Sequence, residues 1–112
     1  MPELPEVETV RQTLLMLIRG ATIKDVFSAY QKQIKMPFDV FKHRIIGQTF
    51  EDIQRKGKYL IFVLSKDYMI VHLRMEGKFY YVSQAQPVQK HEHVIFELSD
   101  DMTLRYHDVR KF

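Results

Sequence analysis

The segment KYLIFVLS, residues 58–65, is apolar without interruption from Tyr59 to Leu64. A run with no polar face predicts a central strand. Other segments of the second half are also rich in β-branched and aromatic residues, and turn signals at 66–67, 76–77 and 100–101 separate some of them. We therefore predict an antiparallel meander. The further strand segments are TFEDIQRK (49–56), YMIVHL (68–73), KFYYVS (78–83), HVIFELS (93–99) and MTLRYHD (102–108).

The first half of the chain has a different pattern. Apolar residues recur at helical spacing over residues 5–19, and Gly20 follows as a helix C-terminal residue. A strand is predicted at 22–30 and a second short helix at 38–46, which Gly47 closes. The predicted fold class is α+β, mostly β: an antiparallel β-sandwich of about six to eight strands with an N-terminal helix and a second short helix.

Composition narrows the class of protein. The 112 residues predict a single domain with a core, and 46% of them are hydrophobic. No apolar run reaches the roughly 18 residues of a membrane span, and the acidic start does not match a signal peptide. We expect a cytoplasmic protein without a membrane partner. The sequence has no cysteine, which excludes disulfides and thiolate metal sites within it.

The charge is unevenly distributed. The formal net charge is +3, but three of the 14 acidic residues are Glu3, Glu6 and Glu8, so the remaining 11 stand against 17 lysines and arginines. This distribution favours a polyanion-binding surface around an acidic pocket, although a solvated basic surface would look similar.

The N-terminus carries candidate catalytic groups. Pro2 follows the initiator Met, whose removal we expect, and this would leave a secondary amine that is less basic than lysine and more nucleophilic at neutral pH. Its attack on a sugar aldehyde carbon would give an iminium suited to elimination. Glu3 and Glu6 could supply a general acid and a carboxylate that supports the developing cation. The alternatives are an ordinary processed terminus and carboxylates that stabilise the start of a helix.

Five motifs, in this order, resemble one family. PELPEVETVR (2–11), GKYL (57–60), HLRMEG (72–77), KHEHV (90–94) and DVRKF (108–112) are similar to the N-terminal catalytic domain of bacterial formamidopyrimidine-DNA glycosylase. The resemblance spans the whole chain. It implies a base excision repair enzyme that removes oxidised purines such as 8-oxoguanine and formamidopyrimidines from double-stranded DNA. It also implies an AP lyase activity, β,δ-elimination through a Schiff base on the N-terminal proline.

The resemblance assigns roles to individual residues. Pro2 is implied as the nucleophile, Glu3 as the acid that protonates the sugar ring oxygen, Glu6 as a supporting carboxylate and Lys58 as the lysine that approaches the lesion and its phosphate. Without the resemblance, Lys58 would be a solvated lysine at the start of a strand.

Three further residues match the side chains that fill the gap left by an extruded nucleotide, a step that costs a few kcal/mol of unstacking. They are Met75, Arg110 and Phe112. An apolar wedge together with an arginine that pairs with the orphaned cytosine suits this task.

The resemblance also implies a DNA-binding set, in which Lys111 stands where many relatives have arginine and therefore lacks the bidentate fork. The set is His72, His91, Arg110 and Lys111. His91 and His93 form an H-x-H pair predicted on one strand face, but the sequence offers no third ligand and we expect no metal in this chain.

Family members continue beyond this region. The resemblance implies that 1–112 is one N-terminal catalytic domain, and that a helix-two-turn-helix region and a four-cysteine zinc finger, with one zinc ion, lie outside it. No cofactor is expected in the chain itself. A monomer acting on DNA in the bacterial cytoplasm, associated with the nucleoid, is the expected form.

Three alternatives stay open. An endonuclease VIII-like enzyme would prefer oxidised pyrimidines, but such proteins typically begin PEGPE, so Leu4 favours the purine branch. A proline-based tautomerase would run directly into a strand, whereas residues 5–19 are predicted as a helix. As an isolated fragment, the chain could be a weak nucleic-acid-binding β-sandwich without full activity.

Overall fold

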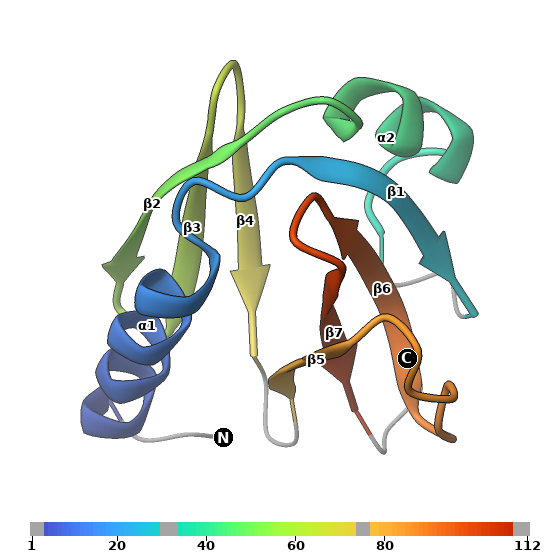
Figure 1. Cartoon of the computed structure of the whole chain (residues 1–112). Coiled ribbons are helices and arrows are strands. Elements are labelled where there is room, and N and C mark those ends of the chain that lie inside the picture. The colour runs from blue at the N-terminus through green and yellow to red at the C-terminus, as the bar shows by residue number, and fades with distance from the viewer. Residues whose placement is uncertain (1–3, 30–33, 74–76, 109–112) are drawn as a thin grey trace.

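Residues 4–29, 34–73 and 77–108 are described by the structure, a computed structural model. Within these residues the chain forms two helices and seven strands, which confirms the predicted fold class. Figure 1 shows the elements as α1 (Leu4–Ile18), β1 (Ile23–Ser28), α2 (Phe38–Ile45), β2 (Phe50–Lys56), β3 (Tyr59–Leu64), β4 (Tyr68–His72), β5 (Lys78–Ser83), β6 (Glu92–Leu98) and β7 (Met102–His107).

The first half folds as its periodicity predicts, with element ends within one or two residues of the expected bounds. Gly20 and Gly47, the predicted helix-closing residues, have φ values of 86° and 91°. Only glycine enters this left-handed region without a steric cost, so both positions end their helices sharply. The first helix packs beside β2, and the backbone after it pairs with the start of that strand (Figure 1).

Two antiparallel sheets form the sandwich. One has the order β2-β3-β4 and the other has the order β1-β6-β7-β5. The central position predicted for KYLIFVLS is confirmed, because β3 pairs with a strand on each side. Its side chains alternate: Leu60, Phe62 and Leu64 are buried in the core, while Tyr59 is 47% exposed.

The predicted meander is correct for the first sheet and wrong for the second. Strand β4 does not pair with β5, and β5 pairs with β7 instead of β6. The turn signal at 76–77 therefore marks a crossing between sheets. Turn residues indicate only where a chain reverses. Strand order depends on long-range pairing, here the pairing of β1 with β6.

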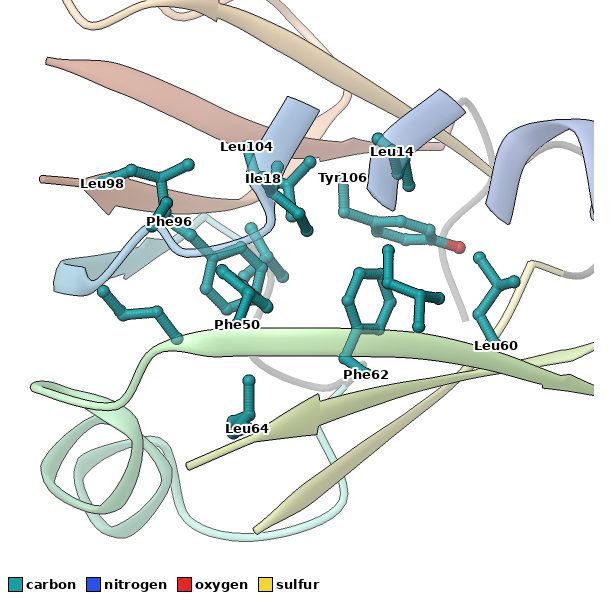
Figure 2. Packing of buried hydrophobic residues seen from close by; sticks show 14 of the residues in the cluster. Leu14, Ile18, Phe50, Leu60, Phe62, Leu64, Phe96, Leu98, Leu104 and Tyr106 are labelled. Atoms are coloured by element: carbon teal, nitrogen blue, oxygen red, sulfur yellow. The ribbon is translucent and has the colours of Figure 1, made fainter. Parts of the chain in front are cut away.

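The core lies between the two sheets, and α1 closes one side of it (Figure 2). A row of aromatic rings joins the sheets. The ring centroid of Phe79 on β5 lies 5.4 Å from that of Phe62 on β3 and 5.3 Å from that of Tyr106 on β7. Aromatic rings bury large areas and pack with defined geometry, so this row fixes one sheet against the other. The fully or nearly fully buried apolar residues include Val7, Leu14, Ile18, Ile23, Val26, Phe50, Ile53, Leu60, Phe62, Leu73, Phe96, Leu98 and Leu104.

Candidate nucleic-acid interface

The described candidate site residues lie at the ends of elements that share one edge of the sandwich. The start of α1, the turn between β2 and β3, the end of β4, the start of β6 and the end of β7 all lie in the lower part of Figure 1. Glu6 is in the first turn of α1, Lys58 follows Gly57 in the turn, His72 ends β4 and His91 directly precedes β6. The other predicted site residues, Pro2, Glu3, Met75, Arg110, Lys111 and Phe112, lie outside the described residues.

The turn that carries Lys58 is tight. Lys56 pairs with Tyr59, which leaves two residues to reverse the chain, and Gly57 takes a φ of 60° at the first of them. A two-residue hairpin with glycine in this place matches the twist of the strands. Lys58 is half-buried here, and the next residue, Tyr59, stacks on His72 with ring centroids 4.7 Å apart. The residue that follows Lys58 is thus the cross-strand neighbour of His72.

The carboxylate of Glu8 and the arginines that it binds hold α1 against this turn. Both oxygens of Glu8 accept hydrogen bonds from Arg11, the closest at 2.6 Å, and Oε1 also accepts one from Arg55 Nε at 3.2 Å. Arg55 in turn donates to the carbonyl of Gly57. The hydrogen bonds from Arg11, Gln12 and Arg55 lower the pKa of Glu8 to about 2. The sequence predicts Glu8 only as a helix-start carboxylate, and its partner in β2 comes from long-range packing.

A buried arginine fixes the opposite part of the edge. Arg105 is 1% exposed, and all five of its N–H groups have acceptors. It forms a 2.9 Å salt bridge with Glu92, which is also buried. Three of its hydrogen bonds go to the carbonyls of Ser83, Gln86 and Pro87, so it holds the segment that leads to His91. Sequence reasoning missed this residue because an arginine in a half-polar strand is normally solvated.

The join between the sheets requires glycine. Gly77 donates a 2.8 Å hydrogen bond to the carbonyl of Leu73 across the crossing. A Cβ at this position would lie 2.2 Å from that carbonyl oxygen and 2.6 Å from the hydroxyl of Tyr106. The hydroxyl of Tyr106 donates to the carboxylate of Asp108, which is fully buried just before 109–112. The end of β4, the start of β5 and the end of β7 are therefore tightly connected.

The predicted H-x-H face is wrong. Alternate residues share a face only on a regular strand. His91 lies before β6 with a φ of 73°, and a bulge interrupts the pairing between Glu92 and Val94. His93 is 3% exposed, whereas the ring of His91 lies against His107, at 5.8 Å. Within the described ranges no group of three His, Asp or Glu side chains could hold a metal ion.

The charge at this edge is positive after its pairs are counted. Glu8 and Glu92 are in salt bridges with arginines, and Glu6 is an exposed carboxylate. Lys56, Lys78 and Lys90 are exposed, and within the described part of the chain none of them has a salt bridge. Unpaired lysines around fixed backbone turns form an electrostatic surface suited to a polyanion.

Comparison with known proteins identifies the family. The model of the formamidopyrimidine-DNA glycosylase N-terminal domain matches residues 1–112. The chain belongs to the formamidopyrimidine-DNA glycosylase family. Proteins named formamidopyrimidine-DNA glycosylase from Geobacillus kaustophilus and Shouchella clausii are 51% and 52% identical to it over 114 residues. The alignments cover 100% of this chain but 42% and 41% of those proteins, so the chain spans about two fifths of their length.

Solved structures agree with this family. The Lactococcus lactis Fpg protein in complex with DNA containing an abasic site matches with a TM-score of 0.94 and 42% identity, over 99% of this chain and 42% of that one. A complex of the same organism's Fpg (MutM) with DNA containing FAPY-dG matches with a TM-score of 0.93 and 42% identity, over 98% of this chain and 42% of that one. The resemblance inferred from the five motifs is confirmed. No helix in the described ranges is long and apolar enough to span a membrane.

Proposed function

We propose that this chain is the N-terminal catalytic domain of a DNA glycosylase with AP lyase activity that removes oxidised purines from double-stranded DNA. The observation that carries the proposal is the shared edge described above. The start of α1, the turn between β2 and β3, the end of β4 and the start of β6 come from distant parts of the sequence and lie along it (Figure 1). The family match and the DNA complexes of similar proteins support the same assignment.

The proposed mechanism begins at the N-terminus. The free amine of Pro2 attacks C1′ of the damaged nucleotide and displaces the base. Glu3 protonates the ring oxygen as the C1′–O4′ bond breaks, which opens the sugar and leaves an iminium between Pro2 and C1′. Glu6 supports the developing cation from the first turn of α1. Lys58, whose turn is linked to α1 through Glu8 and Arg55, contacts the lesion phosphate. Elimination at the iminium then cuts the strand.

DNA binding in this proposal uses both sheets. His72 and His91 contact backbone phosphates, with Arg110 and Lys111 beside them. Met75, Arg110 and Phe112 fill the gap left by the extruded nucleotide. The exposed lysines 56, 78 and 90 add attraction that weakens with salt.

We also propose that a helix-two-turn-helix region and a zinc finger complete the enzyme outside these residues. The chain has no cysteine, and its described residues offer no group of three metal ligands, so the zinc expected for the family does not fit here. The complete enzyme would act as a monomer on DNA in the bacterial cytoplasm, associated with the nucleoid.

Borohydride trapping tests this function. Full-length protein incubated with a duplex that carries 8-oxoguanine opposite cytosine should give a covalent protein–DNA product, because reduction fixes the iminium on Pro2. Protein that retains Met1, checked by mass spectrometry, should give no product, since an acylated nitrogen has no nucleophilic lone pair. Equal trapping by both forms would refute the proline mechanism.

A second variant tests the general acid proposed for base removal. Glu3→Gln should abolish excision of 8-oxoguanine because the ring oxygen loses its proton donor. Single-turnover excision at the rate of the unmodified protein would remove Glu3 from the mechanism. A parallel duplex with an oxidised pyrimidine distinguishes the endonuclease VIII-like alternative.

A further inference from the structure

His107 lies beside the proposed DNA-binding residues without an assigned role. It is the last residue of β7 and alternates with Leu104 and Tyr106, which enter the core, so its side chain is on the outer face of the four-stranded sheet. Its ring lies edge-on to two others, 5.8 Å from His91 and 5.5 Å from Tyr80. Two imidazoles therefore meet at the edge where β6 begins and β7 ends.

Both imidazoles have an unused polar atom. The Nδ1 atoms of His91 and His107 are shielded from solvent and have no hydrogen-bond partner within the described residues. Buried polar atoms of this kind are uncommon and costly in folded proteins. These Nδ1 atoms are out of reach of a ligand, whereas the Nε2 atoms of both rings are not shielded, so an anion arriving from solvent could accept a hydrogen bond from Nε2 of each ring.

The backbone presents His91 to His107 in a fixed position. His91 has a φ of 73°, which is uncommon for a residue with a Cβ, and the amide of Asp108 donates a 2.9 Å hydrogen bond to its carbonyl. The bulge between Glu92 and Val94 lies directly after it, opposite His107. Bulges and strained backbones frequently orient side chains at functional sites.

The charged groups around the pair favour an anion. Lys78 and Glu92 are the cross-strand partners of His107 on β5 and β6, and Tyr80 is the other ring in contact with it. Glu92 is in a salt bridge with Arg105, the next residue of β7 on this face. Lys90, which precedes His91, and Lys78 are exposed and have no salt bridge within the described ranges.

We propose that His91 and His107 form one phosphate-binding site, in which His107 is a second imidazole ligand for the same DNA backbone phosphate. This inference rests on the proposed function and deepens it, because of these two histidines the family resemblance assigns a phosphate contact to His91 alone. Each ring donates a hydrogen bond from Nε2 to the phosphate, so removing the charge of that one phosphate weakens both contacts.

The experiment replaces individual phosphates by neutral methylphosphonates. Full-length protein is titrated with a duplex containing a tetrahydrofuran abasic-site analogue and with an undamaged duplex, each carrying one neutral linkage at a time. The unmodified protein should lose affinity at the phosphate that the pair contacts. His91→Phe and His107→Phe should each weaken binding about five- to tenfold and become insensitive to the neutral linkage at that same position. The slope of log K against log salt should decrease by about one in each variant.

Two further variants keep the result interpretable. His107→Asn keeps a polar side chain of smaller size and should also become insensitive to the neutral linkage at that position. His43→Phe changes an exposed histidine on α2, at the far end of the molecule, and should leave affinity and the sensitivity to that linkage unchanged (Figure 1). Thermal unfolding of each variant confirms that it is folded.

Either of two results would overturn the inference: His107 variants that bind within twofold of the unmodified protein, or a sensitive phosphate for His107 that differs from the one for His91. The undamaged duplex separates this inference from the proposed function. Loss of affinity in both histidine variants on both duplexes, without any preference for the abasic analogue, would support the phosphate site and contradict the glycosylase assignment.

Discussion

The two parts of the candidate interface are held by very different interactions. The helix and the Lys58 turn depend on Glu8, Arg11 and Arg55, whose side chains are 24–32% exposed. The segment before His91 depends on Arg105 and Glu92, whose side chains are 2% and 4% exposed. Water and salt weaken the first cluster, whereas neither reaches the second. The part that holds α1 and the Lys58 turn is therefore sensitive to pH and salt, whereas the part that holds the segment before His91 is not.

The largest expected effect comes from the buried arginine. Arg105→Ala leaves Glu92 charged and unpaired in the interior and frees three backbone carbonyls. We expect the free energy of unfolding to fall by about 3–5 kcal/mol, measured by urea denaturation. The double variant Arg105→Met with Glu92→Leu should recover much of this loss, because no buried charge remains. A loss below about 1 kcal/mol in the single variant would contradict the role given to this pair.

Gly77, which lies between β4 and β5, can be substituted without changing the residues of either cluster. Gly77→Ala places a Cβ within 2.2 Å of a backbone oxygen that cannot move freely. The expected loss is about 1–3 kcal/mol of stability, together with weaker DNA binding because the ends of β4 and β7 shift. Gly47→Ala, at the end of α2 and away from the interface, is the comparison variant: nothing lies within 4 Å of its Cβ position, so it carries only the backbone strain of a φ of 91°, about 1 kcal/mol, and no clash. Equal losses in both variants would contradict a specific requirement at Gly77.

The exposed cluster should respond to pH. The pKa of Glu8 is about 2 in the folded protein against an unperturbed value of 4.5, so folding favours its charged form. This stabilisation is complete above pH 4.5 and is lost as the pH falls through 2. Glu8→Gln should lower the Tm by a few degrees at pH 6–7, and the difference from the unmodified protein should shrink between pH 4.5 and 2. A difference that is constant over this range would exclude the carboxylate charge as its cause.

The smallest effect is expected far from the interface. Arg44 forms a 2.8 Å salt bridge with Asp67, but the arginine side chain is 63% exposed. Exposed ion pairs contribute little, so Arg44→Ala should change the Tm by less than about 2 °C and leave DNA binding unchanged. A larger change in either measurement would show that the exposure of an ion pair does not predict how much it contributes, and would contradict the comparison of the two clusters.

Local patterns predict most of the fold and only part of the site. Helix ends at Gly20 and Gly47 follow from periodicity and glycine chemistry, and the central place of β3 follows from its apolar run. The pairing of β5 with β7 does not follow from any local pattern, because it depends on contacts between distant parts of the chain. Glu6, Lys58, His72 and His91 are found through motif resemblance. Arg105 and His107 become visible only once the segment at 84–91 and the neighbouring ring are placed in space.

The way Arg105 holds its neighbouring segment has a consequence for engineering. Apart from its bonds to Thr103 and Glu92, the guanidinium contacts only backbone carbonyls, at Ser83, Gln86 and Pro87. A carbonyl oxygen is the same in every residue, so these contacts do not depend on side-chain identity. Gln86 is exposed and Val88 is 62% exposed. A cysteine introduced at either position would carry a fluorophore beside the proposed DNA-binding edge without loosening the protein, and would report when a duplex arrives.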